Sequence, residues 1–175
     1  TLVVFLRSFS CYGLVDHRIF RPWKWYGIPF FLLRRKRNLP FLQRADLIFS
    51  NSEFMRQAWK NRLGIQSTVL YPFVSGDNFG PPADPDSRIA ITFSGISREK
   101  GAHIALQIAA ALPDRPFLVL KGRNPERGLL RQFSRLPNVE LLDWIQNMKA
   151  IYDRTRLVLI PSLWEEPFGR IPVEA

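Results

Sequence analysis

Short apolar runs and helical patterns alternate regularly along the second half of the chain. The runs have the length and composition of strands buried on both faces, and they occupy residues 89–93, 117–120, 139–142 and 157–160. The stretches between them carry apolar residues at helical spacing, over residues 103–112, 125–136 and 146–154. Strands that alternate with helices in this way predict a parallel α/β sheet with right-handed crossovers.

The first half of the chain has a less regular pattern. Three apolar stretches predict strands, at residues 2–6, 45–50 and 68–71. A helix is expected from about Pro29, followed by a turn at residues 38–40, because Gly27 and Pro29 interrupt the preceding aromatic stretch. The run from Ser50 to Glu53 has the form of a capping box, with Ser50 as N-cap, and predicts a second helix that ends near Gly64. The inner face of that helix is expected to carry Met55, Ala58 and Trp59.

Residues 75–87 form the one stretch dense in Gly, Pro and Asp, which is typical of a linker. We therefore expect two α/β parts, residues 1–76 and residues 77–175. Asp84 and Asp86 in this stretch have the spacing of a metal-binding pair, but the flanking prolines favour a solvated turn.

The composition of the chain limits the kinds of protein to which it can belong. The chain has 175 residues, 46% of them hydrophobic, which is enough for a substantial core. The single cysteine, Cys11, excludes an internal disulfide and fits a reducing compartment. No apolar run approaches a membrane span, and residues 1–6 are too short for a signal peptide. The chain begins without methionine and ends within an expected helix, so it reads as part of a longer protein.

Positive charge is concentrated in the first part of the chain. Residues 1–75 contain 12 Lys and Arg against 3 Asp and Glu, whereas residues 76–175 contain 13 against 12. A basic half joined to a nearly neutral half predicts that the first faces an anionic partner. Lipid headgroups, nucleic acid and acidic glycans all fit that description.

The candidate chemistry lies at the end of the chain, in residues 157–175. An apolar strand is stopped by Pro161, and a loop with Glu165 and Glu166 follows. A helix can begin only near Arg170, since Pro172 is tolerated in a first turn but not in an interior. Strand, loop and helix start form the place where open α/β sheets bind anions. The carboxylates, including Glu174, suit sugar and ribose hydroxyls; the alternative is that they only complement the positive end of a helix.

The string PS-x-x-EEPFG-x-x-x-x-EA resembles the signature of retaining GT-B glycosyltransferases of the "group 1" type, family 4. The resemblance implies a hexosyltransferase-type enzyme with a Rossmann-like donor-side domain, here residues 77–175, preceded by the latter part of an acceptor-side domain. It implies transfer of a sugar from a nucleotide-sugar donor to an acceptor hydroxyl with retention. Glu166 would contact the donor sugar and Glu174 the ribose, while Phe168, Gly169 and Arg170 would present the helix start to the diphosphate. The acceptor would be a glycan or a lipid-linked sugar.

The loop at residues 94–101 follows an expected strand and contains Gly95, Arg98 and Lys100, a composition suited to cradle phosphates. It resembles the Gly-Arg…Glu-Lys-Gly loop of the same glycosyltransferases, in which Arg and Lys hold the donor diphosphate. Ile96 stands where that family usually has Arg, and the spacing to Lys100 is one residue shorter, so Arg98 would take that role. The resemblance implies stabilisation of the leaving diphosphate without a metal and without any cofactor besides the donor.

Other polar and aromatic residues allow two interpretations. Lys121 and Arg123 follow the strand at 117–120 and either assist the phosphates or form a plain turn. Trp144 either stacks on a base or packs in the core, and Tyr152 is expected in the core. His17 is a lone histidine in an expected loop at residues 7–22, and it receives no catalytic role.

The segment 23–37 combines aromatic residues with four consecutive cations, Arg34, Arg35, Lys36 and Arg37. It predicts either a peripheral contact with an anionic membrane or a buried helix whose cations meet its own terminal carbonyls. The first would place the protein in the cytoplasm, at the inner membrane face. A membrane-surface or nucleic-acid-binding module without catalysis is the alternative to an enzyme. Nucleic acid is the less favoured partner because no recognisable binding motif is present.

Overall fold

The computed structural model describes residues 1–7, 28–74, 80–81, 83–143, 145 and 148–175, with side chains in the first helix described from Lys36 onward. Cys11, His17 and Trp144 lie outside these residues, as does the expected loop before residue 23. The chain divides into two compact units, each considered by itself. Unit 1 is Thr1–Phe73 with Trp164–Arg170, and unit 2 is Val74–Leu163 with Ile171–Ala175. The assignment of residues 1–76 and 77–175 to acceptor-side and donor-side domains stays a prediction.

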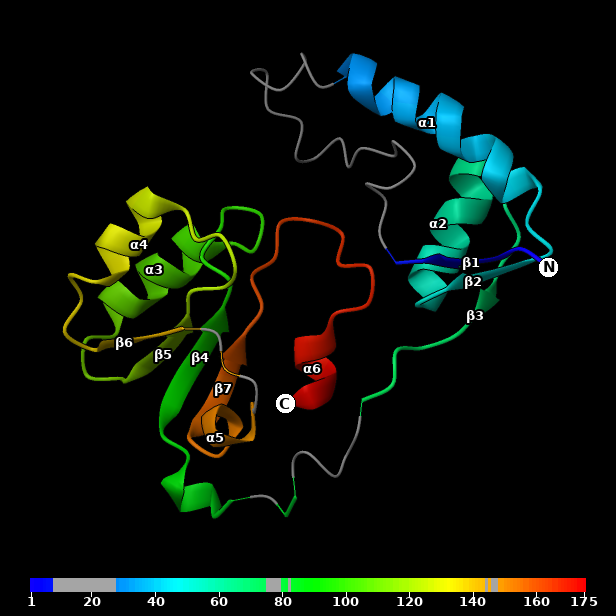
Figure 1. Cartoon of the computed structure of the whole chain (residues 1–175). Helices are drawn as coiled ribbons and strands as arrows, with labels where there is room; N and C mark the ends of the chain where they lie inside the picture. The colour runs from blue at the N-terminus through cyan, green and yellow to red at the C-terminus, as the bar shows by residue number, and fades with distance from the viewer. Residues whose placement is uncertain (8–27, 75–79, 82, 144, 146–147) are drawn as a thin grey trace. The chain divides into compact units, whose positions relative to one another are not determined.

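Unit 2 is built on a four-stranded parallel sheet, as the alternating pattern predicts (Figure 1). Its strands are β4 (Ala90–Ser94), β5 (Phe117–Leu120), β6 (Val139–Leu142) and β7 (Thr155–Leu159). They lie in the order β6-β5-β4-β7. The carboxyl ends of parallel strands share one edge of the sheet, so the loops that follow them gather there.

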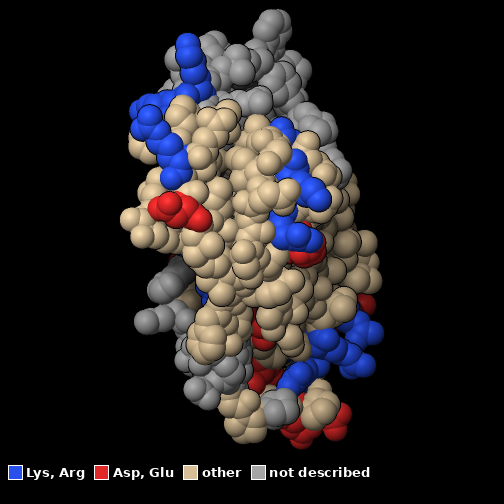
Figure 2. All heavy atoms as spheres, turned by 90° about the vertical axis from the view of Figure 1, so that its right-hand side faces the viewer, with Lys and Arg blue, Asp and Glu red and all other residues tan. Residues whose placement is uncertain are grey.

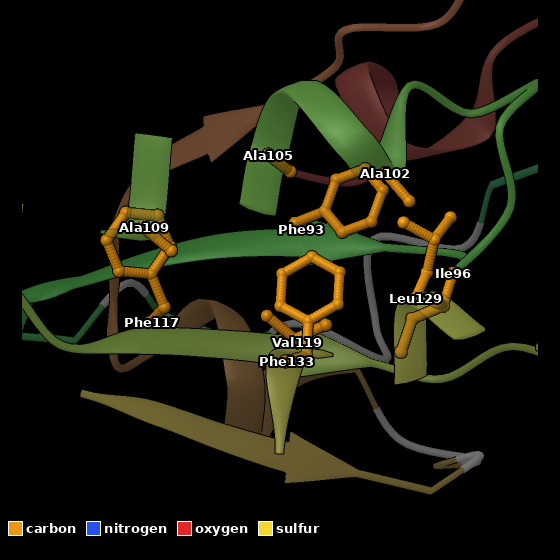
Figure 3. Close-up of a cluster of buried hydrophobic side chains, with 9 residues drawn as sticks. All are labelled: Phe93, Ile96, Ala102, Ala105, Ala109, Phe117, Val119, Leu129 and Phe133. Atoms are coloured by element: carbon orange, nitrogen blue, oxygen red, sulfur yellow. The ribbon is translucent and has the colours of Figure 1, made fainter. Parts of the chain in front are cut away.

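Helices cover both faces of this sheet. One face packs against α3 (Ala102–Ala111) and α4 (Arg127–Phe133), around a buried cluster that includes Phe93, Phe117 and Phe133 (Figure 3). The rings of Phe93 and Phe133 stack with centroids 6.3 Å apart. The other face packs Leu118 and Leu120 against Ile151 of the short helix α5 (Lys149–Tyr152). Successive residues of a strand point to opposite faces, so the continuous apolar run of β5 fills both cores.

Unit 1 contains a smaller parallel sheet in the order β1-β2-β3. Its strands are β1 (Val3–Leu6), β2 (Leu47–Ser50) and β3 (Thr68–Val69). Two helices belong to the unit, α1 (Ile28–Gln43) and α2 (Glu53–Leu63), which Figure 1 shows in blue to green. Their buried residues meet the sheet in one cluster, made of Leu6, Leu42, Met55 and Trp59. The inner face expected for the second helix is confirmed, since Ala58 packs against the same cluster.

Two local expectations in unit 1 are wrong. The first helix does not turn at residues 38–40 but runs through Pro40 to Gln43. Leu42 is 2% exposed and Leu39 packs against the same core, so burial of this last turn outweighs the hydrogen bond that Pro40 cannot make.

The second helix is capped by Ser52 rather than Ser50. The Ser52 side chain accepts a hydrogen bond from the backbone N–H of Met55 at 3.0 Å, whereas Ser50 is the last residue of β2 and is fully buried beside Ser67. The predicted end at Gly64 is confirmed, because Gly64 adopts φ +67° and closes the helix.

In unit 2, before β4, Asp84 caps a 3-10 turn at Pro85–Ser87, where its side chain accepts a hydrogen bond from the N–H of Asp86 at 3.0 Å. The solvated turn expected there is confirmed.

The last helix, α6 (Arg170–Glu174), begins at the residue that the position of Pro172 predicts. None of the helices in the described part of the chain is both long and apolar enough to span a bilayer.

Candidate functional site at the carboxyl edge of the second sheet

The loop between β4 and α3 is held firmly against β5. The N–H of Gly95 donates to the carbonyl of Leu120 at 2.9 Å, and the N–H of Ile96 donates to that of Lys121 at 3.1 Å. Ile96 is 1% exposed and belongs to the core under α3 and α4. This burial accounts for an apolar residue at the position where the loop that it resembles has Arg, because the Ile96 side chain anchors the loop to the core.

Gly95 and Lys100 are brought together by this loop. Gly95 has φ +96°, and a Cβ added there would lie 3.2 Å from Cγ of Lys100. A side chain at position 95 would therefore be strained and would also press on the Lys100 stem. The loop therefore keeps a half-buried lysine beside a partly exposed glycine, and its use as a cradle for an anion stays a prediction.

Arg98 is tied to Glu126, a residue that sequence reasoning missed. The backbone N–H of Arg98 donates to one carboxylate oxygen of Glu126 at 2.8 Å, and its guanidinium lies 3.8 Å from the other. Glu126 is the N-cap residue of α4, and its own N–H donates to the carbonyl of Ile96 at 2.8 Å. The sequence offered no local signal for this contact, because Glu126 lies within the expected helical stretch 125–136 and 28 positions from Arg98. Both side chains are well exposed, so this ion pair contributes at most about 1 kcal/mol and an incoming anion can compete for Arg98.

The segment after β7 closes against the same loop. Gly101 has φ +75°, and a Cβ added there would lie only 2.0 Å from the carbonyl oxygen of Pro161. Two residues further on, the N–H of Leu163 donates to the carbonyl of Glu99 at 2.9 Å. Residues about sixty positions apart in sequence thus share one edge of the sheet, and only glycine fits between them.

Lys121 and Asp143 add a second pair of charges at this edge. They follow β5 and β6, which are neighbours in the sheet, and their Nζ and Oδ1 atoms lie 3.0 Å apart. The side chain of Asp143 is 85% exposed and that of Lys121 27%, so the lysine is the better packed of the two partners. The carboxyl edge of the sheet therefore carries three cations on two loops, Arg98 and Lys100 after β4 and Lys121 after β5.

The terminal motif is divided between the two units, because Trp164–Arg170 belongs to unit 1 and Ile171–Ala175 to unit 2. Glu174 belongs to unit 2, where the hydroxyl of Tyr152 donates to its Oε2 atom at 3.3 Å. The expected core position of Tyr152 is confirmed, since it is 8% exposed. A cavity of about 310 Å³ next to Tyr152 is lined by residues of β7 and α6, and none of the predicted ligand-binding residues lines it.

The other predicted residues of the terminal motif lie in unit 1, namely Glu166, Phe168, Gly169 and Arg170. Gly169 has φ +74°, a backbone conformation that requires glycine at this turn before α6. The grouping of these residues with Lys100 and Glu174 around one donor stays a prediction. Among the residues that the structure describes, no three His, Cys, Asp or Glu side chains cluster so as to hold a metal ion.

Comparisons with known proteins identify the fold. No protein-family model and no curated protein sequence matches the chain. Among solved structures, Anabaena HepE in complex with UDP aligns with 99% of this chain at a TM-score of 0.67 and 21% identity. S. aureus TarM, as a variant in complex with fondaparinux, alpha-GlcNAc-glycerol and UDP, aligns with 91% at a TM-score of 0.65 and 12% identity. A further TarM structure aligns with 77% at a TM-score of 0.60 and 12% identity.

The chain spans about half of the HepE chain and about a third of the TarM chains. These neighbours are GT-B glycosyltransferases with Rossmann-like folds. The chain therefore has a GT-B-like α/β fold built on Rossmann-like parallel sheets.

Proposed function

We propose that this chain is part of a glycosyltransferase that moves a hexose from a nucleoside-diphosphate sugar to an acceptor hydroxyl, with retention and without a metal. One observation carries the proposal: Gly95 and Gly101 hold Lys100 in a rigid loop at the carboxyl edge of a parallel sheet, in a fold shared with proteins solved with UDP. Open α/β sheets bind ligands at this edge. The nucleotide-sugar is the donor substrate, and no further cofactor is proposed.

Lys100 and Arg98 would stabilise the negative charge that develops on the leaving diphosphate. Lys100 offers a point charge on a half-buried stem, and Arg98 offers a fork that its exposed pairing with Glu126 leaves open to exchange. Phe168, Gly169 and Arg170 would present the first N–H groups of α6, Glu166 would accept hydrogen bonds from the donor sugar, and Glu174 from the ribose. The retaining mechanism and the family 4 assignment come from the sequence resemblance alone.

The test is calorimetric titration of the full-length protein with UDP, GDP and ADP. The wild type should bind at least one of them, and Lys100→Ala should weaken that binding by about 10- to 100-fold, the range expected when a charge-assisted hydrogen bond is lost. Glu174→Ala should weaken binding of the same nucleotide. Lys60→Ala, which removes an exposed lysine of α2, is the matched control and should leave the affinity unchanged. Absence of binding to every nucleoside diphosphate by the wild type would contradict the proposal.

We also propose peripheral binding of the protein to an anionic membrane surface, at the inner face of the cytoplasmic membrane, where a lipid-linked acceptor would be met; a soluble glycan is the alternative acceptor. Lys36, Arg37 and Phe41 of α1 are exposed, Phe41 to 59%, which places cations beside an apolar ring. Figure 2 shows Lys and Arg side chains at several places on the upper part of one face. The side chains of Arg34 and Arg35 lie outside those described.

Co-sedimentation with vesicles containing about a third anionic lipid tests this proposal. Replacement of Arg34, Arg35, Lys36 and Arg37 by Ala should abolish most of the binding, whereas replacement of four exposed cations of unit 2 should not. Equal sedimentation of the two variants would contradict the membrane contact. Binding to oligonucleotides that weakens steeply with salt would instead favour the nucleic-acid alternative.

A further inference from the structure

The segment Trp164–Arg170 carries most of the terminal motif and contacts other residues of unit 1, among them Ser52, Arg62 and Tyr71. The hydroxyl of Ser52, the N-cap of α2, donates a hydrogen bond to the carbonyl of Pro167. Arg62 near the end of α2 forms an ion pair with Glu165, with Nη2 and Oε2 2.8 Å apart. The ring of Tyr71 lies against that of Phe168, with centroids 6.1 Å apart. Both ends of α2 thus contact the segment.

The ion pair between Arg62 and Glu165 is partly shielded from water. The side chain of Arg62 is 28% exposed and that of Glu165 13%. On the same helix, Arg56 pairs with Glu53, but those side chains are 39% and 56% exposed. A more shielded pair is weakened less by solvent, and removing one partner leaves the other charge poorly hydrated. The Arg62 contact should therefore restrain the segment, while the Arg56 contact should do little.

We propose that Arg62 is a positioning residue for Glu166, acting through Glu165. Arg62 holds the Glu165 carboxylate, and the next residue in the chain is the one proposed to contact the donor sugar. Fixing one residue of an adjacent pair limits the conformations open to the other, and a displacement of about 1 Å at such a group lowers catalysis about 100-fold. This inference rests on the proposed function for the role of Glu166, but the anchoring itself does not.

The anchoring is tested by amide hydrogen exchange in the full-length protein. Arg62→Ala should speed the exchange of the amides of residues 163–170 by about 10-fold, because loss of a partly buried charged hydrogen bond makes local opening easier. Arg62→Lys keeps the charge and should recover part of the protection. Arg56→Ala is the control, with the same change on the same helix at an exposed pair, and should leave exchange of this segment unchanged. Equal exchange in the Arg62→Ala and Arg56→Ala variants would overturn the proposal.

A double-variant comparison shows whether the effect passes through Glu165. Glu165→Gln alone should speed exchange of the segment, and combining it with Arg62→Ala should add little, since both changes remove the same contact. If the two effects multiply instead, Arg62 acts through some other contact and the proposal is wrong.

The positioning role is tested by steady-state transfer with the nucleotide-sugar that the wild type uses. Arg62→Ala should lower kcat by about 10-fold or more while the affinity for the free nucleoside diphosphate changes less than about 3-fold, because the diphosphate is assigned to Lys100 and Arg98 on a different loop. Arg62→Lys should recover part of kcat. Faster exchange with unchanged kcat would mean that Arg62 is only structural and would overturn the positioning role. A wild type that uses no nucleotide-sugar refutes the proposed function and with it the positioning role, while exchange still decides the anchoring.

Discussion

Among the residues that the structure describes, the two parallel sheets differ in how many of their faces are covered. In unit 2, all four residues of β5 are at most 5% exposed, because α3 and α4 cover one face and α5 the other. In unit 1, Leu6 is fully buried on the face toward α1 and α2, yet Val3, Phe5 and Leu47 are 53%, 40% and 42% exposed. Val3 pairs with Leu47 and Phe5 with Phe49, so these side chains share the other face.

An apolar run therefore predicts a strand more reliably than it predicts burial. The runs at residues 2–6 and 117–120 have the same character, and both form parallel strands. Their surroundings are set by helices elsewhere in the chain, which a strand's own residues do not encode. Stability in the described residues should consequently depend much more on the core of unit 2 than on the open face of unit 1.

The largest predicted effect follows from this difference. Phe133→Ala removes a fully buried ring stacked on Phe93 and should destabilise the protein by about 3–5 kcal/mol. Phe5→Ala removes a ring that is already 40% exposed and touches Phe49 at a centroid distance of 6.2 Å, so it should cost about 1–2 kcal/mol. Urea unfolding of both variants measures the difference. Equal losses would mean that the open face is covered in solution.

Two glycines, one in each unit, have similar positive φ angles but different surroundings. Gly101→Ala would place Cβ 2.0 Å from the Pro161 carbonyl and should cost about 3 kcal/mol, since the strain of φ +75° adds to a clash with backbone. Gly64→Ala at the end of α2, with φ +67°, meets nothing within 4 Å and should cost about 1 kcal/mol. Urea unfolding measures both losses.

The same pair connects stability with the candidate site. Nucleoside diphosphate affinity should fall in Gly101→Ala, because the loop that holds Lys100 must move, and should be unaffected in Gly64→Ala. A Gly101→Ala variant with wild-type stability and affinity would show that the contact with Pro161 does not hold the loop.

Some features of this fold can be predicted from neighbouring residues in the sequence, and others depend on distant residues. The four strands of unit 2 and the boundaries at Gly64 and Arg170 follow from residues within a few positions of each feature. The course of α1 through Pro40 and the capping by Ser52 do not, because distant partners decide them: the core around Leu42 in the first case and the carbonyl of Pro167 in the second. Sequence reasoning fails where a contact joins positions far apart in the chain.

The candidate site shows the same limit. The loop with Gly95 and Lys100 and the terminal motif could be predicted because each is a short string with known chemistry. Glu126 beside Arg98 and Arg62 beside Glu165 could not, since they are separated by 28 and 103 positions from the residues they contact. Charged partners of this kind carry no local signature and emerge only once the strands are placed in order.

A smaller loss of stability is expected when one side chain amide of unit 2, that of Asn138, is removed. The side chain N–H groups of Asn138 donate to the carbonyls of Ala109, Leu112 and Arg115 at 3.0, 2.9 and 3.1 Å, joining the end of α3 to the start of β6. Asn138→Ala should cost about 2 kcal/mol because it leaves these carbonyls without that donor. Asn61→Ala in unit 1 removes an exposed amide whose oxygen accepts a hydrogen bond from the side chain N–H of Gln57 at 3.2 Å, and should cost less than about 0.5 kcal/mol. Similar losses in urea unfolding would contradict the role of Asn138.

The smallest effect concerns one exposed ion pair in each unit. In unit 2, the hydrogen bond from Arg154 holds the pKa of Glu140 below its ordinary value of 4.5, against a smaller opposing effect of burial. A lowered pKa means that the stabilisation is complete above the unfolded-state value and disappears as the pH falls through the folded-state value. Glu140→Gln should therefore lose less than about 1 kcal/mol at neutral pH, because both side chains are about half exposed, and should match the wild type in acid.

Glu53 in unit 1 has its pKa lowered in the same direction by Arg56, and its side chain is the more exposed of the two carboxylates. Glu53→Gln should thus shift stability no more than Glu140→Gln does, with the same disappearance in acid. Urea unfolding at neutral and acidic pH compares the two variants. Since the charged pairs of the two units are expected to be alike, a larger pH-dependent loss from Glu53→Gln would mean that charge as well as apolar burial distinguishes unit 1 from unit 2.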